Sequence, residues 1–376
     1  MGNEHKIYDY NILNITGHEK SVEFLKNLFH GGRMPSGLLF HGRQNIGKRF
    51  VATAFAASVL CEDYALYERR RNATFPSSDD PADAVGGGLN FCGKCPSCIG
   101  VLNGTSQNFM LVEPSGSSIK IDNIHKIGSF LSLTPYYQGY RFIIIDEAST
   151  MTSGAANALL KMLEEPSAKT VFILIVHNLS TLLPTVISRC LLLKFGPVGD
   201  KVLIDVFRSE FPDIKEDVLR LYSKIAMGSY SDFYGLVKGD YLEKRNLLVD
   251  TVFKELAYNP SSVNPYDMSN NFLSGAGKGG ENERKAANFE MILFILRDVY
   301  IYYVTKSAEL LYNEDIAGEI REITEGFENF GVTRKDLVYM INLTVNHMEK
   351  MKSYNLNKTI ALDSYFSGLL YLKGRI

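Results

Sequence analysis

The stretch from Arg141 to Cys190 constrains the fold of this chain more than any other. It opens on four apolar residues that fit a parallel strand covered on both faces, and this run ends in Asp146 and Glu147. A helical segment stopped by Pro166, another apolar run and a Ser-Arg-Cys turn follow. Because acids at the carboxyl end of a parallel strand lie where such sheets bind ligands, the stretch predicts an α/β fold with a site at the sheet edge.

The sequence on either side continues the alternation of apolar runs and helical segments. Candidate strands cover residues 37–41, 109–112, 141–145, 171–176 and 191–195. Candidate helices cover residues 48–60, 122–133 and 153–165, and an amphipathic first helix follows Thr16-Gly17-His18. This alternation predicts a parallel α/β sheet.

A damaged phosphate loop follows the first candidate strand. Such loops read Gly-x-x-x-x-Gly-Lys-Ser/Thr, in which the lysine reaches the terminal phosphates and the hydroxyl holds Mg²⁺. Gly42, Gly47 and Lys48 match this pattern, but Arg49 stands at the hydroxyl position and cannot ligate a cation. Weak nucleotide binding stays open, whereas metal-assisted hydrolysis is not expected. The alternative is a glycine-rich turn that binds nothing.

Four cysteines form a candidate metal site. Cys92, Cys95 and Cys98 follow the spacing C-x-x-C-x-x-C, and Cys61 at the end of the second candidate helix is the natural fourth ligand. In a chain without an export signal this spacing favours structural zinc, which takes four tetrahedral ligands. An iron–sulfur cluster and free thiols are the alternatives, although a ferredoxin run needs a further Cys-Pro that is absent here. The fifth cysteine, Cys190, is interpreted as a packed core thiol.

Composition sets limits on the domains and on the partners. A chain of 376 residues predicts two or three domains, and the formal net charge of −2 gives no global field that draws it onto nucleic acid. The segments 62–91 and 259–280 are rich in Gly, Ser, Pro or Asn and are interpreted as loops or insertions. The amino terminus lacks an apolar signal region and no run reaches membrane-spanning length, so a cytoplasmic location is expected.

The acid pair, the helix before Pro166 and the Ser-Arg-Cys turn, in this order and spacing, closely resemble the bacterial clamp-loader family. These AAA+ subunits load the sliding clamp for the replicative DNA polymerase. The resemblance implies that Arg189 is an arginine finger, which acts in trans on ATP held by a neighbouring subunit. It implies that Asp146 and Glu147 correspond to a Walker B pair, here in a degenerate nucleotide site, and that Asn178 stands at a γ-phosphate sensor position.

The same resemblance implies the zinc module and the domain plan. The family carries an inserted zinc module, which places the ligands at Cys61, Cys92, Cys95 and Cys98. It implies an AAA+-like domain over residues 1–197, a helical lid over 198–242 and a helical collar over 243–376. The collar would join five subunits in a ring.

The damaged phosphate loop together with the retained finger favours an ATP-inert subunit of the DNA polymerase III clamp loader. The expected partners are gamma/tau and delta subunits, the sliding clamp and primer-template DNA, with no membrane contact. The chain itself would have no independent activity within the DNA-directed DNA polymerase complex. The alternatives are an ATP-binding gamma/tau-type ATPase subunit and a stand-alone zinc protein that binds nucleic acid. Few basic residues surround the cysteines, which argues against the last of these.

Overall fold

The computed structural model describes residues 17–63, 91–133, 139–258, 264–274, 281–353 and 358–370. The chain divides into two compact units, Met1–Leu203 with Met227–Ser231 and Ile204–Ala226 with Asp232–Ile376. The domain limits expected after residues 197 and 242 stay a prediction. In the described part of the chain, no helix is both long and apolar enough to cross a membrane.

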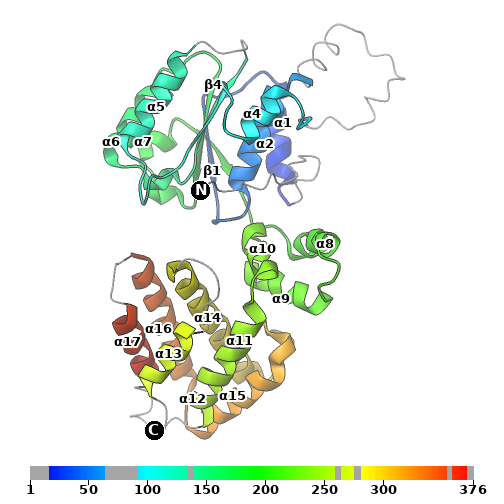
Figure 1. Cartoon of the computed structure of the whole chain (residues 1–376), viewed down its shortest axis with the longest axis vertical. Coiled ribbons are helices and arrows are strands. Elements are labelled where there is room, and N and C mark those ends of the chain that lie inside the picture. The colour runs from blue at the N-terminus through cyan, green and yellow to red at the C-terminus, as the bar shows by residue number, and fades with distance from the viewer. Residues whose placement is uncertain are drawn as a thin grey trace, which may run out of the picture. The chain divides into compact units, whose positions relative to one another are not determined.

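The first unit is built on a parallel sheet of five strands in the order β2-β3-β4-β1-β5 (Figure 1). The strands are β1 (Gly37–His41), β2 (Phe109–Val112), β3 (Arg141–Ile145), β4 (Thr170–Val176) and β5 (Leu191–Lys194). All five predicted strands are confirmed, with limits that differ by at most one residue. Because all five strands run in the same direction, the loops after them meet at one edge of the sheet.

Helices cover both faces of this sheet (Figure 1). Those on one face are α1 (Glu19–His30), α2 (Lys48–Leu60) and α4 (Pro96–Leu102). Those on the other are α5 (Ile121–Ser132), α6 (Ser153–Glu164) and α7 (Pro184–Ile187). The central strands are therefore apolar on both sides: Leu38 and Phe40 of β1 enter one core, and Leu39 enters the other.

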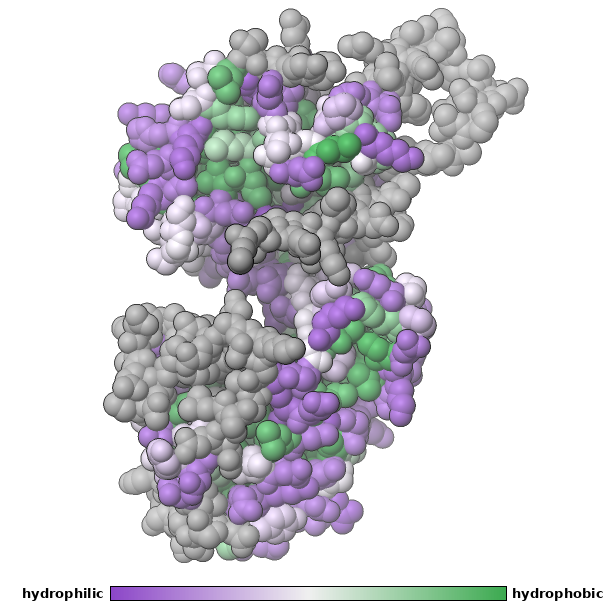
Figure 2. Space-filling model, viewed as in Figure 1, coloured by the Kyte–Doolittle hydropathy of each residue, from purple (hydrophilic) through white to green (hydrophobic). Residues whose placement is uncertain are grey.

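The second unit is helical in the part that the structure describes. Its elements are α8 (Asp200–Glu210, beginning in the first unit), α9 (Glu216–Ala226), α10 (Tyr230–Lys238, also beginning in the first unit), α11 (Tyr241–Leu248), α12 (Lys254–Tyr258), α13 (Pro265–Ser274), α14 (Glu281–Thr305), α15 (Ala317–Asn329), α16 (Arg334–Ser353) and α17 (Lys358–Leu370). The guanidinium of Arg245 is buried and donates to Asp315 at 2.8 and 2.5 Å, which ties α11 to the segment before α15. Figure 2 shows hydrophilic residues over much of the described surface in this view.

Residues 259–280 were expected to form a loop or an insertion. The loop is wrong for the part that forms α13 (Pro265–Ser274), which packs against α17, whereas the insertion stays a prediction. The segment is rich in Asn and Ser, residues that favour turns, and this content concealed the helix. In the structure Met268 is buried, and the hydroxyl of Ser269 donates to the carbonyl of Pro265 one turn earlier in the helix. The other expected insertion, 62–91, lies almost entirely outside the described residues.

Candidate functional site

The phosphate loop turns from β1 into α2 at the carboxyl edge of the sheet. Gly42 and Gly47 have φ values of 149° and 95°, a backbone that L side chains rarely adopt. Lys48, which is only 4% exposed, donates to the carbonyl of Gly42 at 2.7 Å and also to that of Arg43. Burial lowers the pKa of Lys48, although Asp146 and Glu147 act in the opposite direction. The turn from β1 into α2 therefore holds Lys48 against its own carbonyls, and its role as a phosphate-binding loop stays a prediction.

Gly42 offers a test of how tightly this loop is built. A Cβ at this position would lie 2.3 Å from the backbone carbonyl oxygen of Phe195, which cannot move without shifting the chain after β5. We expect Gly42→Ala to lower the free energy of unfolding by about 1–3 kcal/mol, measured by urea denaturation. Gly139→Ala is the matched control, because a Cβ there meets no atom within 4 Å. Equal stability of the two variants would contradict this description of the loop.

The first acid of the predicted pair is in contact with Arg49. Asp146 follows β3, and burial raises the pKa of its carboxyl group, whereas Arg49 lowers that pKa. Nη1 of Arg49 lies 3.5 Å from Oδ2 of Asp146 and also forms an ion pair with Glu113. Glu113 was not predicted from the sequence. It directly follows β2, as Asp146 follows the neighbouring β3, and that position was the available signal.

The second acid is also paired within the chain. Oε2 of Glu147 lies 2.6 Å from Nε2 of His177, a residue that directly follows β4 and that sequence reasoning missed. Glu147 itself has a φ of 50°, in the left-handed region. Asn178 follows shortly after the end of β4, as expected, and its side chain accepts a hydrogen bond from the backbone N–H of Ser180. Its role as a γ-phosphate sensor stays a prediction.

The contacts of Arg189 are with a different set of residues. It stands between α7 and the edge strand β5, with its side chain 36% exposed. Its guanidinium pairs with Glu164 at the end of α6, at 2.6 Å, and donates to the carbonyl of Thr185 at 2.9 Å. Cys190 is buried in the core next to it, as predicted, and burial raises the pKa of its thiol to about 11.

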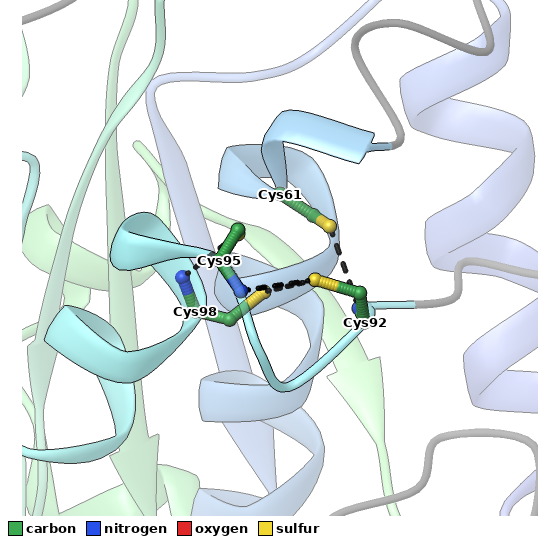
Figure 3. A group of neighbouring side chains, drawn as sticks. All are labelled: Cys61, Cys92, Cys95 and Cys98. Carbon is green, nitrogen blue, oxygen red and sulfur yellow. Dashed lines mark hydrogen bonds between the residues drawn. The ribbon is translucent and has the colours of Figure 1, made fainter.

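The four predicted cysteines come together in space. The sulfur atoms of Cys61, Cys92, Cys95 and Cys98 all lie within 4.8 Å of one another (Figure 3). Cys61 ends α2, Cys95 caps the amino terminus of α4 and Cys98 lies in its first turn, so two helix ends and one short loop hold the cluster. The Sγ atoms of Cys92 and Cys98 are 4.0 Å apart, close to the separation of about 3.8 Å that tetrahedral zinc with Zn–S bonds of about 2.3 Å requires.

The hydrogen bonds of the cluster also suit thiolate ligands. Backbone N–H groups of Lys94 and Cys95 donate to Sγ of Cys92 at 3.4 and 3.2 Å, and the N–H of Cys98 donates to Sγ of Cys95 at 3.4 Å. Burial raises the pKa of Cys92 to about 11. The pKa of Cys98 is also raised, chiefly by a side-chain hydrogen bond with Cys61 and secondly by burial. A bound cation would reverse these shifts, because it draws coordinating thiols into the deprotonated form. The cluster could therefore hold a metal ion.

Comparison with known proteins finds similarity to subunits of DNA polymerase III. Residues 82–199 match the family described as DNA polymerase III, delta subunit. The chain is 30% identical to DNA polymerase III subunit delta' of Pseudomonas aeruginosa over 220 residues, which is 58% of this chain and 60% of the relative. It is 26% identical to the delta' subunit of Bacillus subtilis, over 78% of this chain and 80% of the relative.

A subunit with a different name is also similar. The DNA polymerase III subunit tau of Bacillus subtilis is 25% identical over 358 residues, which is 91% of this chain and 58% of the relative. The chain thus spans less than two thirds of the length of the Pseudomonas delta' and Bacillus tau relatives. The matched segment and these relatives, together with the parallel sheet and its cysteine cluster, support a clamp-loader subunit of DNA polymerase III that is similar to the delta' subunits.

Proposed function

We propose that this clamp-loader subunit is inert toward ATP and donates Arg189 in trans to ATP held by an adjacent ATPase subunit. The observation that carries the proposal is the contrast between two arginines. Arg49 replaces the magnesium-binding hydroxyl and contacts the acids of its own site, whereas Arg189 lies half-exposed at the edge of the sheet. In this proposal the first arginine disables its own site for hydrolysis, and the second can leave its exposed ion pair to serve another subunit.

The contacts of the phosphate loop support inertness. Hydrolysis needs a lysine directed at the terminal phosphates, a hydroxyl and an acid on Mg²⁺, and a second acid that orients water. Here Lys48 donates to loop carbonyls, Asp146 contacts Arg49, and Glu147 is paired with His177. Each group that a nucleotide would require already has a partner within the chain.

The environment of Arg189 supports the finger role. A guanidinium is always charged and presents a planar set of donors, which suits the charge that develops on a transferred phosphoryl group. Its partner Glu164 is 49% exposed, so their ion pair contributes little free energy and can be exchanged for a stronger anion. In this proposal the pair with Glu164 is the resting state of the finger.

The wider assembly is part of the same proposal. Gamma/tau and delta subunits would join this chain in a ring of five through the helical second unit, and the ring would open the sliding clamp and place it on primer-template DNA. A structural zinc ion at Cys61, Cys92, Cys95 and Cys98 would hold the carboxyl end of α2 against α4. The location in the cytoplasm follows from this role.

ATP hydrolysis by the isolated chain is the direct test of inertness. We expect no release of phosphate above a protein-free blank in the presence of Mg²⁺ and ATP, because the site lacks a magnesium-binding hydroxyl. A tau subunit assayed in parallel serves as the positive control. Turnover by the isolated chain would contradict inertness and favour the alternative, an ATP-binding gamma/tau-type subunit. The similarity to tau over 91% of this chain is the observation in favour of that alternative.

A further inference from the structure

The acids at the carboxyl edge of the sheet form a pair that the phosphate-loop pattern does not include. Val112 and Ile145 are partners in the register of β2 and β3, so Glu113 and Asp146 are the next residues on neighbouring strands. The backbone N–H of Asp146 donates to the carbonyl of Val112 at 2.9 Å, which extends this pairing by one residue. Two carboxyl groups thus stand side by side, and Glu113 raises the pKa of Asp146.

Two neighbouring carboxylates favour a cation beside them. Carboxylate oxygens are the protein ligands that Mg²⁺ prefers, and the phosphate-loop pattern implies this ion at this place. In this chain the cation that contacts both carboxylates is Arg49, from the first turn of α2. The guanidinium of Arg49 already places a positive charge beside one oxygen of each carboxylate, and this charge opposes the entry of a divalent cation. The residues present do not fit the metal.

We propose that Arg49 is a built-in replacement for the divalent cation of the phosphate-loop site. It neutralises Glu113 and Asp146, holds the loops after β2 and β3 together, and keeps divalent metal ions out of the site. The substitution thus does more than remove a ligand: it supplies the positive charge that the carboxylates would otherwise take from a metal. This inference concerns the cation alone and does not depend on the finger role of Arg189.

The proposal predicts that removing Arg49 creates a metal site. We expect Arg49→Thr to bind one Mn²⁺ per chain at least tenfold more tightly than the unaltered chain, measured by the electron paramagnetic resonance signal of free Mn²⁺. The protein is saturated with zinc beforehand, so that the cysteine cluster does not contribute. Arg49→Lys is the matched control, because it keeps the positive charge and is expected to bind Mn²⁺ as weakly as the unaltered chain.

A second variant tests whether the new metal site uses these carboxylates. Adding Asp146→Asn to Arg49→Thr is expected to abolish the gain in Mn²⁺ affinity. The proposal is overturned if folded Arg49→Thr binds Mn²⁺ no more tightly than the unaltered chain. It is equally overturned if the unaltered chain binds Mn²⁺ and loses that binding on Asp146→Asn, a measurement that does not require Arg49→Thr to fold. Hydrolysis of ATP by the isolated chain, in contrast, bears on the proposed function.

Discussion

Arg189→Ala is expected to reduce ATP turnover by about 10³-fold or more at the one site of a reconstituted clamp loader that faces this chain. Total turnover then falls to the level of the sites that other subunits serve. The physical reason is that an arginine finger neutralises charge that develops only in the transition state. The side chain is half-exposed and its ion pair lies at the surface, so its removal is expected to change the stability of this chain by no more than about 1 kcal/mol. Steady-state phosphate release by the complex, compared with its unaltered form, gives the measurement.

Two further variants distinguish a finger from a surface arginine. Arg189→Lys keeps the charge but loses the planar fork, and we expect it to recover only part of the activity. Glu164→Gln removes the resting partner of Arg189 and leaves the guanidinium intact. Because an exposed ion pair is worth about 0–1 kcal/mol, this variant should keep turnover within about fivefold of the unaltered complex. Unchanged turnover in a complex that contains Arg189→Ala would refute the finger role.

The sheet was predictable because its central strands β1, β3 and β4 are covered on both faces. Every residue of β3 is buried and all but Arg141 are apolar, a pattern that a surface helix does not show. The predicted limits of α2 also agree with the structure, since the phosphate-loop glycine precedes it and Cys61 ends it. The helix α13 was missed because its buried positions carry Met268 and Ser269 among asparagines, which reads as a loop.

The partners of the site residues were harder to predict than the residues themselves. The phosphate-loop spacing pointed to Lys48, and the end of an apolar run pointed to Asp146. The C-x-x-C-x-x-C spacing pointed to three of the four cysteines, and Cys61 was added as the natural fourth ligand. Glu113 and His177 join the site only through the order of the strands, which places the ends of β2, β3 and β4 side by side. That order depends on packing between segments far apart in the chain, and local patterns do not contain it.

Loss of the proposed zinc ion from the cysteine cluster is expected to have the largest effect on stability. Cys98→Ser replaces a fully buried sulfur whose partners Cys61, Cys92 and Cys95 all lie within 4.8 Å. We expect this variant to lose bound zinc and more than about 4 kcal/mol of the free energy of unfolding of the first unit. The three remaining thiols would keep neither the charge balance nor the tetrahedral geometry that zinc requires. Metal content by mass spectrometry and urea denaturation measure the two effects.

Cys190→Ser is the matched control, because Cys190 is also buried but lies in the other core of the sheet, away from the cluster. It should retain one zinc ion per chain and lose only about 1–3 kcal/mol, the cost of burying a hydroxyl without a partner. Equal zinc content in the two serine variants would refute the site. Iron and sulfide in place of zinc would show instead that the same four thiolates hold a cluster. The distinction matters for the fold, because a closed zinc site fixes α2 and α4 without redox chemistry, and its loss would release the helix that carries Lys48 and Arg49.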